Sequence, residues 1–164
     1  YLEGFHIPFV HGDLHGVLDY DSYRTELFEG GVLQIGIANE GEACFDLPES
    51  SPDFGKKIAA YYYWIYPGLM LNFYPWGLSV NVVNPISVDR TRIVYHGFVG
   101  EKSMLGKGAG GDLDKVEAED QEIVEATQRG VSSKSYERGR YSPSKEKGVH
   151  HFHRILANSS DNDF

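Results

Sequence analysis

Cysteine is nearly absent from this sequence, since Cys44 is the one thiol among 164 residues. A single thiol excludes a disulfide within the chain, and it excludes a zinc or iron–sulfur site built from several cysteines. The sequence also lacks the run of about 18 apolar residues that a membrane-spanning helix needs, and it has no signal-peptide pattern. We therefore expect no membrane partner and a cytoplasmic location.

Basic residues are scarce as well. The chain has 15 lysines and arginines against 24 aspartates and glutamates, and its formal net charge is -9. Nucleic-acid binding is not expected, because it depends on a patch or stripe of cations that the sequence does not contain. A Walker loop, a Gly-x-Ser-x-Gly elbow and a His-Glu-x-x-His helix are also missing, which argues against nucleotide hydrolysis, serine hydrolysis and zincin proteolysis.

The elements that are present follow a simple order. Apolar or alternating segments bounded by turn residues predict strands over residues 23–29, 31–38, 58–67, 69–75, 78–86 and 91–99. A short irregular helix is predicted over residues 1–11, a loop over 11–23 and a long polar loop over 39–54. Asp112 is a candidate N-cap for a long helix over 113–132, and 145–157 is a second helix or an extended closing segment. Strands first and helices last predict an α+β domain, in which the long helix packs across a curved antiparallel sheet.

Asp120 is an unusual acid within the predicted long helix. At about 100° per residue, one helix face carries Val116, Ile123, Thr127 and Val131. Asp120 falls in the middle of this apolar face, whereas Glu117, Glu119 and the remaining acids are predicted to face water. Burial of an unpaired carboxylate costs roughly several kcal/mol. Asp120 therefore needs a metal, a proton or a cation, and a buried ion pair with an arginine or a strand-end contact is the alternative.

Two histidines near the start of the chain are the natural partners of such an acid. His6 and His11 together with Asp120 make up the ligand types of a 2-His-1-carboxylate iron site. Positions five apart do not share one face of a regular helix, so the two rings converge only if the backbone is irregular, for which Pro8 is a cause. Two ordinary histidines at a helix end are the alternative. Glu3 lies three residues before His6, where it is either a hydrogen-bond acceptor for the ring or a simple acid of the first helical turn.

Aromatic residues make up 13% of the chain and concentrate in residues 61–66 and 73–76. Tyr63, Phe73 and Trp76 are candidates for the wall of a substrate pocket. They would supply cation–π contacts to a quaternary ammonium group or apolar contacts to an aromatic ring. Packing in the core is the alternative for each of them.

Several of these stretches resemble one family in the order in which they occur. The segment Tyr1-Leu-Glu-Gly-Phe-His-Ile-Pro-Phe-Val-His11 resembles the iron-binding segment of the alpha subunits of Rieske-type non-haem iron ring-hydroxylating oxygenases. Asp120, Glu125 and Gln128 are similar to the later part of that family's pattern. Residues 128–130, 136–141 and 148–154 look like its C-terminal end, and residues 70–76 resemble its choline-monooxygenase-like branch. The resemblance covers nearly the whole chain.

The resemblance implies that residues 1–164 are a catalytic domain of the helix-grip (START/Bet v 1-like) type. It implies a mononuclear Fe(II) held by His6, His11 and Asp120, with Glu3 linking a ligand histidine to an electron-delivering cluster. In the family, the enzyme uses O2 to hydroxylate its substrate, which is an aromatic compound, a quaternary ammonium compound or an amine. Its members are monooxygenases or dioxygenases. Electrons come from a [2Fe–2S] cluster, usually of a neighbouring subunit, which a reductase or ferredoxin supplies from NAD(P)H. The implied assembly is a homotrimer.

One part of the family's architecture is missing from the sequence. The N-terminal Rieske domain, with its cysteine and histidine ligands, is not present, and Cys44 cannot replace it. Because residue 1 is Tyr and the histidine motif starts at once, we expect the chain to be the C-terminal part of a longer protein that cannot accept electrons by itself. Two other classes stay open: a metal-free helix-grip domain that binds an apolar ligand, and a zinc hydrolase whose metal is held by two histidines and a carboxylate.

Overall fold

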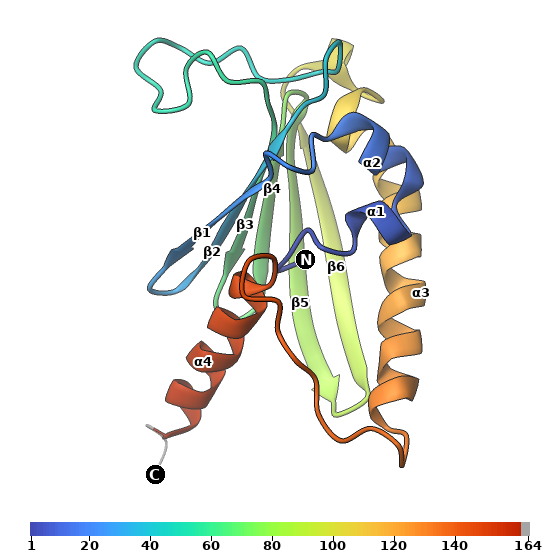
Figure 1. Cartoon of the computed structure of the whole chain (residues 1–164). Helices are drawn as coiled ribbons and strands as arrows, with labels where there is room; N and C mark the ends of the chain where they lie inside the picture. The colour runs from blue at the N-terminus through green and yellow to red at the C-terminus, as the bar shows by residue number, and fades with distance from the viewer. Residues whose placement is uncertain (162–164) are drawn as a thin grey trace.

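The computed structural model describes residues 1–161, and within them six strands form one curved antiparallel sheet (Figure 1). The strands are β1 (Arg24–Phe28), β2 (Gly31–Ile37), β3 (Ile58–Ile65), β4 (Leu69–Tyr74), β5 (Gly77–Ser87) and β6 (Arg90–Val99). Each strand pairs with the next one along the chain, so the sheet order is the sequence order. The six predicted strands are therefore all present.

Helices follow and flank the sheet. They are α1 (Ile7–Val10), α2 (Gly12–Val17), α3 (Leu113–Val131) and α4 (Lys147–Asp161), with short 3-10 turns at Lys102–Met104 and Gly108–Gly110. The Asp112 side chain accepts a hydrogen bond from the Lys115 N–H at 3.1 Å, which confirms it as the N-cap of α3. Figure 1 shows α3 beside β6, with α1 and α2 next to its first turns. A long helix against a curved antiparallel sheet is the α+β architecture that the sequence predicts.

Two predicted segments differ from the structure. Residues 11–23 were expected to be a loop, but they contain α2, whose two glycines, Gly12 and Gly16, obscure the helical pattern. The closing segment is a helix that continues past Ala157 to Asp161. Residues 162–164 lie outside the described residues.

One face of the sheet, here called the inner face, carries the side chains that meet the helices. Trp64 of β3 packs against Phe152 of α4 with ring centroids 5.1 Å apart, and Asn81 of β5 bonds Glu117 of α3. The strand register places Gln34, Tyr62, Asn72 and Ser79 in one row across four strands. The inner face therefore presents a polar row to the helices, although most of its members are buried.

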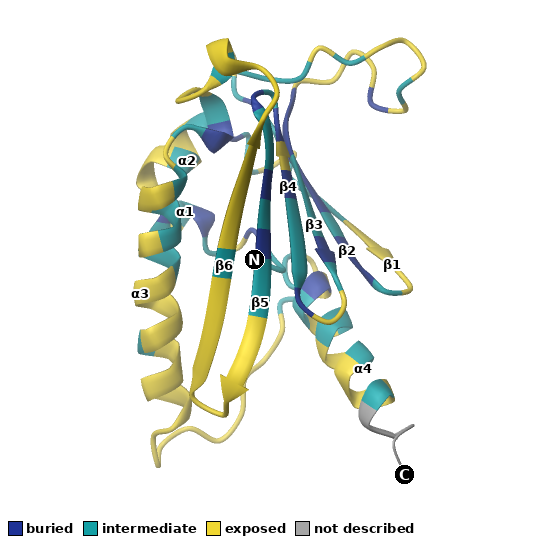
Figure 2. Cartoon of the chain, turned by 180° about the vertical axis from the view of Figure 1, so that it is seen from behind, coloured by how far each residue is buried: buried dark blue, intermediate teal, exposed yellow. Residues whose placement is uncertain are grey.

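The hydrophobic core lies where α1 and α2 meet the sheet. Its buried members include Ile7, Leu18, Ala60, Tyr74 and Trp76. Burial is highest along the middle strands, while β1, β6 and the free end of β5 are exposed (Figure 2). No helix within residues 1–161 is long and apolar enough to cross a membrane.

Candidate metal centre and adjoining cavity

The three candidate ligands meet between the start of the chain and the middle of α3. Asp120 Oδ1 lies 3.0 Å from His11 Nε2 and 3.5 Å from His6 Nε2. The two imidazole rings are 5.1 Å apart at 75° to each other. Among the residues that the structure describes, these three are the one group of at least three candidate ligands with all donor atoms within 4.8 Å.

A break in the backbone brings the two histidines together. His6 is the N-cap of α1, which has Pro8 in its first turn and ends after four residues. His11 then leaves the helical conformation, with φ -109° and ψ 80°, and serves as the N-cap of α2. The irregularity expected near Pro8 is therefore a junction between two short helices, and it turns the His11 ring toward His6.

Each ring is held at its other nitrogen by a carboxylate. The Nδ1–H of His6 donates to Glu3 Oε1 at 2.6 Å, and the Nδ1–H of His11 donates to Glu119 Oε2 at 2.8 Å. A carboxylate on Nδ1 favours the tautomer in which Nε2 keeps its lone pair, which is how metal-binding histidines are commonly oriented. The hydrogen bond expected for Glu3 is present. Glu119 was predicted to face water, and the structure corrects this.

The titration of these groups reflects the same contacts. Burial alone would lower the pKa of His11, but its hydrogen bonds to Asp120 and Glu119 outweigh burial and raise it. Burial alone would raise the pKa of Asp120, but the hydrogen bond and charge of His11 and the charge of His6 help to lower it. The pKa of Glu3 is lowered because its contacts with His6 outweigh burial. These contacts therefore favour ionised carboxylates at Glu3 and Asp120 and the protonated form of His11.

The donor set fits a divalent first-row metal ion. Two ligand atoms at about 2.1 Å from one ion and at right angles to each other lie about 3.0 Å apart. The separations of 3.0 Å and 3.5 Å from Asp120 to the two Nε2 atoms are close to this value. Two imidazoles and one carboxylate are also the ligand types of a facial site with open positions.

A cavity of about 70 Å³ adjoins the three ligands. It lies between the inner face of the sheet and α3, and its wall includes Glu3, His6, His11, Gln34, Tyr62, Asn72, Tyr74, Glu117 and Asp120. Ile7, Leu14, Ala109, Leu113 and Val116 add apolar groups to this wall, and the polar row of the inner face contributes Gln34, Tyr62 and Asn72. This cavity is therefore placed to hold a small molecule next to the three ligands.

The three aromatic residues predicted for the pocket do not line this cavity. Tyr63 and Phe73 alternate with Tyr62, Asn72 and Tyr74 along β3 and β4, so their side chains lie on the opposite face of the sheet. Their rings contact each other there, 6.0 Å apart.

Trp76 is buried in the core, where its Nε1–H donates to the Gly110 carbonyl at 3.1 Å. The prediction of Tyr63, Phe73 and Trp76 as lining residues is thus wrong for all three. The rings that do line the cavity include Tyr62 and Tyr74, which are neighbours of the predicted ones.

Glu117 is a second acid whose position differs from the prediction. It lines the cavity, and Asn81 Nδ2 donates to its Oε1 at 3.2 Å. Burial raises its pKa, and the charge of Asp120 contributes. The helical pattern assigned Glu117 and Glu119 to water because it treated the apolar side of α3 as the buried side.

The residues on that apolar side beyond Asp120 are exposed instead. Ile123 is 43% exposed and Val131 is 41% exposed. Asp120 itself is partly open, with 36% of its side chain exposed. Beyond Asp120, no described segment of this chain buries that side of α3, so hydrophobicity alone does not identify the face that carries the site.

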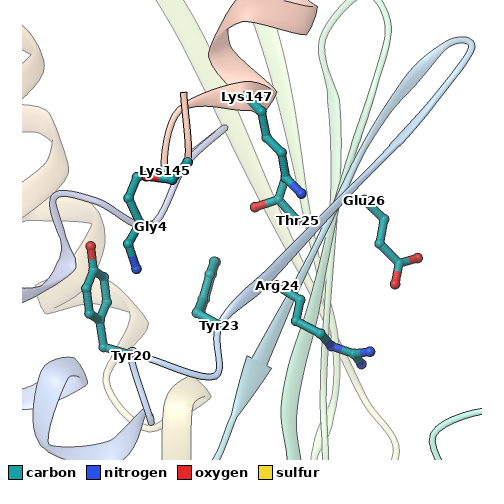
Figure 3. A pocket seen from close by; sticks show the side chains of 9 residues that line it. Gly4, Tyr20, Tyr23, Arg24, Thr25, Glu26, Lys145 and Lys147 are labelled. Atoms are coloured by element: carbon teal, nitrogen blue, oxygen red, sulfur yellow. The ribbon is translucent and has the colours of Figure 1, made fainter. Parts of the chain in front are cut away.

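A larger cavity of about 290 Å³ is lined by residues that include Gly4, Tyr20, Tyr23 and Lys145 (Figure 3). Tyr23 lines both cavities. Gly4 allows the chain to run against this ring, since a Cβ at that position would lie 2.8 Å from it. Lys145, whose ammonium group is 4.1 Å from the centre of the Tyr20 ring, forms part of the same wall. The larger cavity contains none of the three candidate ligands.

Comparison with known proteins adds an independent result. Residues 1–160 match the family model described as ring hydroxylating alpha subunit, catalytic domain. The chloroplastic choline monooxygenase of Arabidopsis thaliana is 34% identical over 164 residues, and the match covers 95% of this chain and 36% of that protein. The oxygenase subunit of carnitine monooxygenase from Escherichia coli K12 is 27% identical over 169 residues, and the match covers 96% of this chain and 44% of that protein. The chain thus spans less than half the length of these relatives.

A solved structure shows the same fold. The structure of a quaternary ammonium Rieske monooxygenase superposes with a TM-score of 0.66 at 22% identity. The superposition covers 96% of this chain and 44% of that one. The helix-grip fold that the sequence resemblance implied is confirmed.

Proposed function

Because the chain belongs to the family of ring-hydroxylating alpha-subunit catalytic domains, we propose that it is the catalytic domain of a Rieske-type monooxygenase with a mononuclear Fe(II) site. The observation that carries the proposal is the convergence of His6, His11 and Asp120 beside a cavity. The proposed substrate is a quaternary ammonium compound, since choline and carnitine monooxygenases are among the relatives.

In this proposal, the iron is held by Nε2 of His6, Nε2 of His11 and the Asp120 carboxylate. Fe(II) bound to such a triad supplies a site at which O2 is activated, since three protein ligands on one side leave other positions open. Glu3 and Glu119 hold the two rings in the tautomer that binds the metal. The inner-face residues of the cavity position the substrate beside the ligands.

The electron supply lies outside the described residues in this proposal. A [2Fe–2S] Rieske domain, a reductase or ferredoxin that uses NAD(P)H, and a homotrimeric assembly complete the enzyme. The proposal that the electron-delivering domain lies outside the described residues is supported by the coverage of relatives, because the chain matches only 36% of the Arabidopsis protein. Glu3 is the proposed link to the cluster, as the family resemblance implies, and its hydrogen bond to His6 supports this role.

Glu117 disfavours the alternative of a metal-free carrier for a purely apolar ligand. Ile7, Leu14, Ala109, Leu113 and Val116 would suit such a ligand, but the ligand would also cover the Glu117 carboxylate and separate its charge from water. A wall with apolar groups and a carboxylate suits an organic cation instead.

Iron binding tests the proposal directly. We expect one Fe(II) per chain after anaerobic loading, measured by metal analysis. The substitution Asp120→Ala removes one of three ligands and should weaken iron binding by about 100-fold or more. Asp114→Ala removes the same charge from an exposed position of the same helix and should leave iron binding unchanged. Equal iron affinity in Asp120→Ala and the unmodified protein would contradict the proposed site.

A further inference from the structure

Glu117 is the acid in the cavity wall that the three-ligand site does not use. We propose that Glu117 makes the cavity selective for a ligand with a cationic head and no anionic group, so that a trimethylammonium alcohol binds and a trimethylammonium carboxylate is rejected. The inference rests on the proposed function for the placement of the substrate. It goes further by naming the residue that sets which charge is accepted.

Apart from the two histidines, the charged side chains of the wall are all acidic, and the α-ammonium group of Tyr1 is the cation whose charge acts to lower the pKa of all three acids. Three acids line the cavity, namely Glu3, Glu117 and Asp120, and no lysine or arginine does so among the described lining residues. Glu3 bonds His6, and Asp120 lies against His11 and His6. Glu117 instead has neutral partners, Asn81 and Tyr95. Among the three acids of the wall, Glu117 is therefore the one whose negative charge is not paired with a histidine of the site.

The Glu117 carboxylate is held in a fixed place. Ser79 Oγ donates to Asn81 Oδ1 at 3.1 Å, and Asn81 Nδ2 donates to Glu117 Oε1 at 3.2 Å. Asn81 is only 3% exposed, and Ser79 lies buried in the same strand. A carboxylate held by a buried amide discriminates between ligand charges better than a mobile one, because less side-chain freedom is lost on binding.

Aromatic rings share the wall with Glu117. Tyr62 and Tyr74 line the cavity and pack edge to face, with ring centroids 5.9 Å apart. Burial raises the pKa of both phenols, so both remain neutral and add no negative charge of their own. The Tyr74 ring is stacked on Trp76, with ring centroids 5.4 Å apart, so Tyr62 is the ring assigned to attract an organic cation by the cation–π interaction. A trimethylammonium group would thus be attracted by Tyr62 and by Glu117 together.

The remaining polar atoms of the wall favour a hydroxyl over a carboxylate. Asn72 Oδ1 accepts from the Tyr1 hydroxyl at 2.5 Å, and the Gln34 amide nitrogen is engaged by the Tyr1 carbonyl. Gln34 Oε1 is the buried side-chain oxygen without a partner in the described part of the chain. A ligand carboxylate would face these acceptor oxygens and the like charge of Glu117 and Asp120, whereas a hydroxyl carries no charge to be repelled.

Three ligands test the proposal by calorimetric titration of the protein. Choline carries the cation, 3,3-dimethyl-1-butanol is its neutral isostere, and carnitine is choline enlarged by a carboxymethyl group, so the change in preference caused by Glu117→Gln separates its charge from its size. We expect the unmodified protein to bind choline more tightly than either of the others, by about tenfold or more. Glu117→Gln should weaken choline binding by about tenfold, leave the neutral isostere unchanged and reduce the preference for choline over carnitine.

Controls separate charge from shape and from the metal. Glu122→Gln removes the same charge from an exposed position of α3 and should not change any of the three affinities. Carnitine binding as tight as choline binding in the unmodified protein would overturn the proposal, even if the Glu117 variant failed to fold. If Glu117→Gln weakened the binding of choline and of its neutral isostere by the same factor, the proposal would also be overturned. Iron content is measured in parallel and the titrations are repeated without metal, so failure of iron binding and failure of charge selection are told apart.

Discussion

The two faces of the β3–β4 hairpin have the same kinds of residue and different roles. Tyr62, Asn72 and Tyr74 lie on the inner face and line the cavity beside His6, His11 and Asp120. Tyr61, Tyr63 and Phe73 are their immediate neighbours in sequence and point to the other face, where Tyr63 and Phe73 contact each other. A step of one residue along a strand therefore separates a tyrosine that lines the cavity from one that packs on the opposite face of the sheet.

The two faces also differ in how they pair their acids. On the outer side, Asp53 bonds Arg24 at 2.9 Å, Lys56 at 2.7 Å and the Tyr61 hydroxyl at 2.9 Å. Two cations surround this buried carboxylate, and together they tie the loop before β3 to β1 and β3. On the inner side, the acids face histidines or an open cavity. Full pairing by cations indicates a structural acid, and incomplete pairing indicates one that is available to a metal or a ligand.

The largest effect that separates the two sides is expected on metal affinity. Glu119→Gln weakens the acceptor that holds His11 Nδ1, and it should lower iron affinity by about 10- to 100-fold, measured by competition with a chelator. Asp53→Asn, on the outer side, should leave iron affinity unchanged. If Glu122→Gln on the exposed side of α3 lowers iron affinity as much as Glu119→Gln does, then Glu119 acts only through overall charge.

A somewhat smaller effect is expected on stability, and it belongs to the outer side. The hydrogen bond from Lys56, followed by those from Arg24 and Tyr61, lowers the pKa of Asp53 from 3.8 to about 2. A carboxyl whose pKa is lowered on folding stabilises the protein above its unfolded pKa. Asp53→Asn should therefore cost about 2 kcal/mol of unfolding free energy at pH 7.

This difference should shrink as the pH falls from about 4 toward 2, because Asp53 becomes protonated in the folded protein too. Urea unfolding at pH 7, 4 and 3 measures it. Asp46→Asn, at an exposed position of the same loop, is the matched control and should change stability little. A cost for Asp53→Asn that stays constant down to pH 3 would mean that ionisation of Asp53 is not its cause.

The smallest effect is expected on ligand affinity, and it compares adjacent tyrosines. Tyr62→Leu removes a ring from the cavity wall and should weaken choline binding by about 3- to 10-fold. Tyr63→Leu removes a ring from the other face and should change choline affinity by less than about twofold, since Tyr63 does not contact the cavity. Equal losses in the two variants would contradict the assignment of the two faces.

Local patterns predicted the elements well. Alternation and turn residues located all six strands, and Asp112 marked the start of α3. Asp120 was found because it conflicts with the apolar pattern around it. Residues 61–66 did not reveal which side chains point to which face of the sheet. They form a nearly continuous aromatic run, and such a run hides the alternation between the two faces of a strand. Tyr63 was therefore chosen where Tyr62 lines the cavity.

The acids of α3 could not be assigned from the helix alone. Its Ile123 and Val131 side remains largely exposed in this chain, whereas Glu117, Glu119 and Asp120 turn toward the sheet and the histidines. A helical pattern reports which residues share a face, but the neighbours decide which face is covered.

The amino-acid sequence by itself determined the strand order, the capped long helix and the ligand types of the candidate metal site. These depend on backbone preferences and on spacings within one segment. The tertiary structure decided that His6 and His11 meet an acid more than 100 residues away, that Glu119 holds one of them, and that Glu117 enters the cavity. Such contacts depend on how α3 lies against the sheet, and this is set by packing between segments that are distant in the chain.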